Sequence, residues 1–184
     1  MNSDIKRKSR QKQTAEIFTP PEIADKMLNL LPSQVWDYKK TFLDPASGNG
    51  GLLLPVLRRK LGDKHDPLQA LKTIFGIDIL ADNVLECRLR LLCLVKEFGY
   101  KITQPMCEAV IQNIIWTPLK DYEKGALDYD FEFSDEPTQE EVESLYKMAN
   151  GETLPDEKIV RAAEEANKMN WLMTNIPFKA EKKN

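Results

Sequence analysis

The stretch that decides the fold is DPASGNGG, residues 44–51. A short β-favouring run, residues 41–44, leads into it, and an apolar run, residues 52–61, follows it. Glycine adopts positive φ without steric cost, so this stretch can make a tight turn that brings backbone N–H groups to the start of a helix. The sequence therefore predicts a strand, a glycine turn and a helix in this order.

The same alternation continues on both sides of the glycine turn. Further strands are predicted at 73–77, 113–116 and 171–174, and helices at 23–31, 81–98, 138–149 and 155–169, with another helix starting at Asp66-Pro67. Strands separated by helices imply parallel pairing, and so a doubly wound, mostly parallel α/β sheet. We expect the strand order 3-2-1-4, which leaves residues 171–174 as an open, apolar edge.

Composition excludes several classes of protein. The 184 residues are 42% hydrophobic and 30% charged, which is typical of one globular domain. No apolar run approaches the roughly 20 residues of a membrane span, and the N-terminus is charged, so we expect a cytoplasmic protein without a membrane partner. The three cysteines have no CxxC spacing and the chain has a single histidine. The sequence therefore predicts neither a metal site nor a Ser-His-Asp mechanism.

Charge divides the chain unevenly. Residues 121–165 hold 15 acidic and 4 basic side chains, a net charge of -11, so the rest of the chain carries +8 of the total of -3. We interpret residues 1–16 as a basic leader and residues 17–184 as the folded domain, with an acidic helical insertion at about 121–169. Basic ends of a chain are either phosphate contacts or solvated tails, and charge alone leaves both open.

An acidic residue closes the second predicted strand. Asp78 would lie at the carboxyl edge of the sheet beside the glycine turn, where an acid accepts hydrogen bonds from ribose hydroxyls, although such an acid is also a common helix cap. Asp44 would repel phosphate there but attract an ammonium group. A ligand that carries both an amine and a carboxylate, such as S-adenosylmethionine, suits this combination.

Four short elements together resemble the N6-adenine DNA methyltransferases of restriction-modification type. They are IFTP at 17–20, DPASGNGG at 44–51, GIDI at 76–79 and NIPF at 175–178, which are similar to that family's FTP, DPACGSGG, acidic and NPPF elements. Their order and spacing match across nearly the whole chain. The resemblance implies a Rossmann-like methyltransferase fold, S-adenosylmethionine as cofactor and DNA as substrate.

The resemblance also assigns site residues. Those implied to bind the cofactor are Phe18, Thr19, Pro20, Asp44, Ala46, Gly48, Gly50, Asp78 and Ile79, and those implied in catalysis are Asn175, Ile176, Pro177 and Phe178. In such a site the Asn175 side chain and the Ile176 carbonyl accept hydrogen bonds from adenine N6, and Phe178 stacks on the flipped base. No metal is required, because methyl transfer depends mainly on positioning.

Two departures from the family keep alternatives open. Isoleucine stands at 176 where the family has proline, and the chain ends six residues after Phe178, so the sheet is expected to be truncated after the fourth strand. A catalytically impaired cofactor-binding subunit or decoy that acts through a partner is one alternative. A protein glutamine methyltransferase is another. The open apolar edge has to be covered by the acidic helical insertion folding back, by a second copy of the chain or by a different subunit, and of these we expect a second copy. DNA recognition through a separate subunit is also expected.

Overall fold

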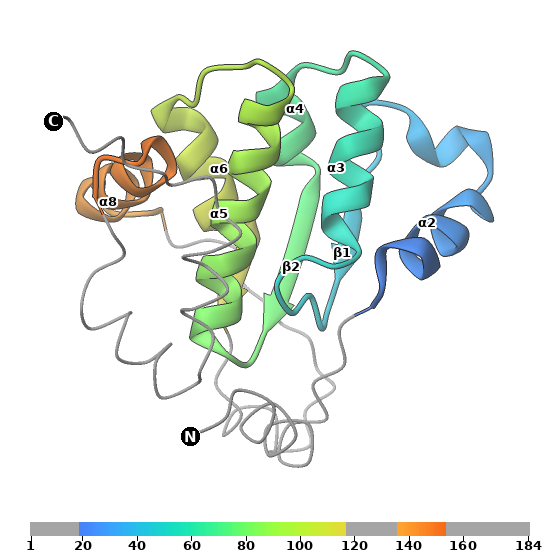
Figure 1. Cartoon of the computed structure of the whole chain (residues 1–184), viewed down its shortest axis with the longest axis horizontal. Coiled ribbons are helices and arrows are strands. Elements are labelled where there is room, and N and C mark those ends of the chain that lie inside the picture. The colour runs from blue at the N-terminus through green and yellow to red at the C-terminus, as the bar shows by residue number, and fades with distance from the viewer. Residues whose placement is uncertain (1–18, 117–135, 154–184) are drawn as a thin grey trace, which may run out of the picture.

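The computed structural model describes residues 19–116 and 136–153 (Figure 1). The described elements, in chain order, are α2 (Pro21–Asn29), the 3-10 helix η1 (Ser33–Trp36), β1 (Phe42–Asp44), α3 (Leu53–Gly62), α4 (Pro67–Lys72), β2 (Ile74–Asp78), α5 (Ala81–Glu97), α6 (Gln104–Asn113), β3 (Ile114–Trp116) and α8 (Gln139–Asn150).

The three strands form a parallel sheet in the order β1-β2-β3. Asp44 of β1 lies beside Gly76 of β2, and Asp78 of β2 lies beside Trp116 of β3. The α/β prediction and the 3-2-1 part of the expected strand order are confirmed. The fourth predicted strand, residues 171–174, lies outside the described residues.

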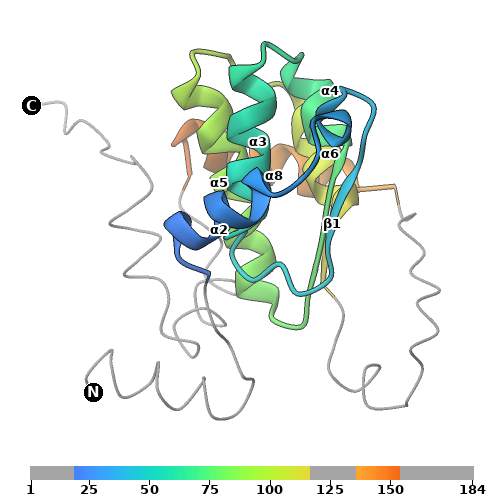
Figure 2. The same ribbon diagram turned by 90° about the vertical axis from the view of Figure 1, so that its right-hand side faces the viewer.

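One hydrophobic core joins the sheet to its helices. β2 is almost wholly buried, as expected of a central strand in a parallel sheet. α3 and α5 lie side by side on one face of the sheet in both views (Figures 1 and 2). Leu57 of α3 and Leu89 and Leu92 of α5 are fully buried in this layer. Both helices run back from the carboxyl ends of strands, so their first turns meet at that edge of the sheet.

Local signals mark several of the helix ends. The Asp66 side chain accepts a hydrogen bond from the Gln69 N–H at 2.9 Å, and proline follows it at the first position of α4, as predicted. Gly99, with φ of 85°, ends α5. The sequence did not predict α6. This helix runs into β3 at residues 113–114 without an intervening glycine or proline, so no breaker marks where the helical period gives way to strand.

α8 confirms the helix predicted at 138–149 and packs on α5 and α6. A reciprocal capping box between Thr138 and Glu141 starts it, and it buries Val142, Leu145 and Met148 in the common core. The acidic segment thus adds a packed helix to the domain, while its solvated carboxylates stay outside. The boundaries of the predicted insertion, 121–169, remain a prediction, because the helix expected at 155–169 lies outside the described residues. None of the described helices is long and apolar enough to cross a membrane.

Candidate functional site

The glycine turn lies at the carboxyl end of β1 and leads into α3. Gly48 and Gly50 have φ of 51° and 91°, which confirms the positive φ predicted for this loop. A Cβ atom at Gly50 would lie 3.0 Å from the Cys87 sulfur of α5. The loop therefore needs glycine at position 50 for two reasons, its backbone angle and its close packing on α5.

Asp78 joins this loop to the end of β2. Its carboxylate accepts hydrogen bonds from the Gly48 N–H at 2.9 Å, the Leu80 N–H at 2.8 Å and the Asn83 Nδ2 at 3.1 Å, and the residue is 9% exposed. The structure thus brings the glycine loop and the predicted acid together. It also gives Asp78 a local role at the start of α5, the alternative that the sequence left open.

The loop crosses β2 at a point where only glycine leaves room. Ser47 is buried, and both its N–H and its hydroxyl donate to the Ile77 carbonyl, at 2.9 and 3.2 Å. A Cβ atom at Gly76 would lie 2.9 Å from the Leu53 Cδ1 and 3.0 Å from Ser47. Sequence reasoning quoted Gly76 only as part of a motif. A glycine inside a strand is the signal that could have marked this close approach.

Two carboxylates share this edge of the sheet. Asp44 accepts a hydrogen bond from the Ala46 N–H at 3.1 Å. Burial raises the pKa of Asp44 above its usual value, the bond from Ala46 opposes that rise, and the nearby charge of Asp78 adds to it. A cationic group placed between the ends of β1 and β2 would relieve this repulsion.

The same loop offers hydrogen-bond donors. Among the described residues, the backbone N–H groups of Asn49, Gly51 and Leu52 have no acceptor, and they lie at the entry to α3. Such N–H groups at the start of a helix favour an anion. Acceptors for a cation and donors for an anion therefore lie within one loop and its flanking strand ends.

The N-terminal end of the described chain lies against this loop. A Cβ atom at Gly51 would be 3.5 Å from the Thr19 carbonyl oxygen, so Thr19 is in contact with the loop. The exposed Pro20 accepts the first hydrogen bonds of α2, from the N–H groups of residues 23 and 24. Phe18, the remaining residue of the predicted FTP element, lies outside the described residues.

Two further predicted cofactor-binding residues lie at the same edge of the sheet, Ala46 on the loop and Ile79 directly after Asp78. Ala46 is exposed on the loop. The Ile79 carbonyl accepts a hydrogen bond from the Trp116 Nε1 at 3.0 Å, which fixes a half-exposed indole at the end of β3. The four predicted catalytic residues, 175–178, lie outside the described residues, so their roles remain predictions.

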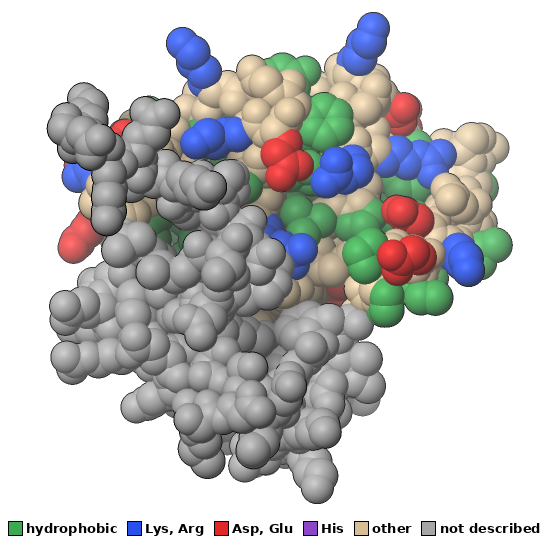
Figure 3. Space-filling model, viewed as in Figure 1, with side chains coloured by type: hydrophobic (Ala, Val, Ile, Leu, Met, Phe, Trp, Pro, Cys, Tyr) green, Lys and Arg blue, Asp and Glu red, His purple; other side chains and the backbone are tan. Residues whose placement is uncertain are grey.

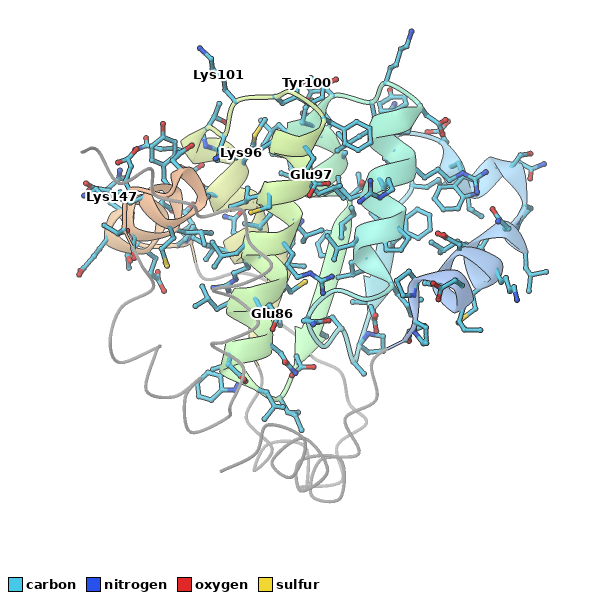
Figure 4. The ribbon with its side chains drawn as sticks, in the orientation of Figure 1. Glu86, Lys96, Glu97, Tyr100, Lys101 and Lys147 are labelled. Atoms are coloured by element: carbon cyan, nitrogen blue, oxygen red, sulfur yellow. The ribbon has the colours of Figure 1, made fainter. Side chains whose placement is uncertain are left out.

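Sequence reasoning missed a charged pair behind the loop. Glu86 and Arg90 of α5 both contact Asn49, and Figure 4 shows Glu86 on the part of α5 nearest the loop. Their spacing, i and i+4 on one helix, was visible in the sequence, but charges at that spacing normally face solvent.

The described residues contain no group of three or more His, Cys, Asp or Glu side chains that could hold a metal ion. Burial raises the pKa of Cys87 and of Cys107 to about 12, so both thiols stay protonated at neutral pH. The cysteines thus behave as the small core residues that the sequence predicted.

Comparison with protein families agrees with this geometry. The model of the N-6 DNA Methylase family matches residues 6–141, about three quarters of the chain. The chain belongs to the N-6 DNA methylase family. The match spans the loop, both acidic strand ends and the start of α8, and it ends before the predicted catalytic residues of this family member. No curated protein and no solved structure matches the chain.

Proposed function

We propose that the chain binds S-adenosylmethionine at the glycine loop and takes part in methyl transfer to adenine N6 in DNA, as in a restriction-modification system. One observation carries this proposal: N–H donors of a glycine loop that have no acceptor among the described residues lie beside two carboxylates on adjacent strand ends, in a member of the N-6 DNA methylase family. A protein that acts on DNA in such a system would be cytoplasmic, as the sequence predicts.

The residues present fit the charge distribution of this cofactor. The N–H groups of Asn49 and Gly51 would bind its carboxylate, and Asp44 would bind its ammonium group. Asp78, at the end of the neighbouring strand, would accept hydrogen bonds from the ribose hydroxyls. Thr19 lies against Gly51 and would border the methionine end.

The predicted catalytic residues would supply acceptors and a stacking surface. When bound, the cofactor supplies an electrophilic methyl group. The Asn175 side chain and the Ile176 carbonyl would accept hydrogen bonds from the two N6 protons and so make the nitrogen a better nucleophile. Phe178 would hold the adenine ring by stacking after the base leaves the duplex.

Contact with DNA would depend on charge near the ends of the chain. In Figure 3, Lys and Arg side chains are interspersed with Asp and Glu over the described part of the visible face, so that face offers no continuous basic stripe. Removal of residues 1–12 deletes five positive charges and one negative charge. The slope of log affinity against log salt should become shallower, since each phosphate contact contributes about 0.9. An equal slope for both forms would exclude the leader as a DNA contact.

A second candidate is a cofactor-binding subunit that acts through a partner. The family match ends at residue 141, and position 176 holds isoleucine in place of the family's proline, which fixes φ. The partner would be a second copy of the chain or another methyltransferase subunit that covers the edge strand predicted at residues 171–174. Methylation of a protein glutamine amide is the remaining alternative for the same fold.

Transfer of a labelled methyl group decides between these functions. The chain alone, and mixed with candidate partner subunits, is incubated with labelled S-adenosylmethionine and adenine-containing DNA, with Asn175→Ala as the matched control. Label in DNA that the control loses supports the proposal. Cofactor binding by calorimetry without transfer to DNA supports the subunit or the glutamine methyltransferase. Absence of cofactor binding contradicts both.

A further inference from the structure

The tip of the glycine loop is held by a charged pair on α5. The Glu86 carboxylate, 1% exposed, accepts a hydrogen bond from the Asn49 Nδ2 at 2.6 Å. Arg90 donates from Nη1 to the Asn49 carbonyl at 2.9 Å, and the same nitrogen lies 3.9 Å from Glu86. The side chain and the carbonyl of Asn49 are therefore both held, which leaves its N–H as the donor that faces no acceptor among the described residues.

Burial of Glu86 makes this contact energetically important. A buried carboxylate is costly unless hydrogen bonds and a counter-charge satisfy it. Here Asn49 of the loop donates one hydrogen bond to Glu86, and Arg90 supplies a positive charge beside it. Burial lowers the pKa of Arg90, and the charge of Glu86 opposes that shift.

The loop needs such support because of its composition. Asn49 lies between Gly48 and Gly50, both with positive φ, and glycine has more backbone freedom to lose than any other residue. Without an external contact the N–H groups of this loop would sample many directions. The contacts to the side chain and to the carbonyl of Asn49 hold its N–H in one of these directions.

We propose that Glu86 and Arg90 are positioning residues, which fix the glycine loop so that the Asn49 and Gly51 N–H groups converge on the amino-acid carboxylate of the cofactor. This inference rests on the proposed function for the identity of the ligand. Its structural half, the clamp on Asn49, stands on the contacts alone.

The chain offers a matched control on the same helix. Glu97 lies near the other end of α5, where it forms a pair with Arg58 at 3.6 Å that is more than half exposed (Figure 4). Glu97→Gln thus makes the same chemical change as Glu86→Gln, on the same helix, away from the loop. Asn49→Ala is a second test variant, because it removes the donor to Glu86 and leaves the carbonyl that Arg90 contacts.

Amide hydrogen exchange in the ligand-free protein tests the clamp. The Gly50 N–H donates to the Ser47 carbonyl within the loop, and the Leu54 N–H, in the first turn of α3, donates to the Gly50 carbonyl. In Glu86→Gln and in Asn49→Ala these amides should exchange about tenfold faster, as loss of a charged hydrogen bond implies, while amides of α4 and α6 keep their rates. Unchanged rates at Gly50 and Leu54, or faster exchange throughout the core, would overturn the clamp.

Calorimetry with two ligands tests the link to the carboxylate. S-adenosylhomocysteine carries the amino-acid carboxylate, and 5′-methylthioadenosine lacks it. Glu86→Gln should weaken binding of the first about tenfold and of the second less than about twofold, and Glu97→Gln should change neither. Equal weakening of both ligands would overturn the positioning role. A wild-type chain that binds neither ligand would overturn the proposed function, whereas the exchange rates still decide the clamp.

Discussion

Polar side chains lie at both ends of the sheet, but they do different things there. At the amino ends of the strands, the buried Lys60 donates to the Lys40 carbonyl and the Thr73 hydroxyl, each at 2.8 Å, and Asn113 donates to the Leu71 carbonyl at 3.1 Å. Each of these bonds satisfies a group of the chain itself.

The carboxyl ends of the strands carry charges and hydrogen-bond donors in a different arrangement. Asp44 and Asp78 bring two negative charges to adjacent strand ends, and three loop N–H groups have no acceptor among the described residues. Glu86 and Arg90 hold the loop in this arrangement. The amino end is thus completed by the chain, whereas the carboxyl end, the edge at which open α/β sheets generally bind ligands, has N–H groups without an acceptor among the described residues. Four substitutions test this difference between the two ends of the sheet.

The largest effect is expected at the carboxyl end, on ligand affinity. Asp78→Ala removes a charged acceptor of ribose hydroxyls, and loss of such a bond weakens binding by roughly 10- to 150-fold. Calorimetry with S-adenosylhomocysteine measures this change. Asn113→Ala, at the amino end, should lower stability and leave affinity intact. Unchanged binding in Asp78→Ala would place the cofactor elsewhere.

Gly76→Ala tests the close packing of the loop on β2. The new methyl group would lie 2.9 Å from Leu53 and 3.0 Å from Ser47, so the free energy of unfolding should fall by about 1–3 kcal/mol. Gly62→Ala is the matched control, because nothing lies within 4 Å of its added Cβ and alanine favours the helix. Chemical denaturation should rank Gly62→Ala at or above wild type, and a reversed ranking would contradict the packing.

Lys60→Met tests the amino end. The substitution keeps an apolar stem but leaves the Lys40 carbonyl and the Thr73 hydroxyl without their donor. The free energy of unfolding should fall by about 1–2 kcal/mol. Affinity for S-adenosylhomocysteine, measured well below the melting temperature, should not change. A loss of affinity comparable to that of Asp78→Ala would show that the two ends do not differ in role.

The smallest effect is expected from Asp44→Asn. Because the pKa of Asp44 is raised in the folded state, its ionised form destabilises that state at neutral pH. Asn should therefore raise stability at pH 7, by less than about 1 kcal/mol because Asp44 is only half-buried and solvent screens it. The gain should shrink as the pH falls through the folded pKa toward the unfolded value of 3.8. A gain that grows with acidity would contradict the sign.

Much of the site could be predicted because its signals are local. The positive φ of Gly48 and Gly50, the place of Asp78 at a strand end and the cap at Asp66 depend on a few adjacent residues. Parallel pairing followed from the alternation of strands and helices. The helix α6 was not predicted, although Thr103 before it and a proline in its first turn are typical of a helix N-terminus.

The sequence by itself determined the α/β alternation, the glycine turn and the acids that follow the strands, since backbone sterics and hydrophobic period act within a few residues. Only the tertiary structure decided that Asn49 meets Glu86 and Arg90, about forty residues further along the chain. It also decided that Gly76 leaves room for Ser47. Such contacts depend on the register of the strands and the rotation of α5 about its axis, and the packing of the whole core sets both.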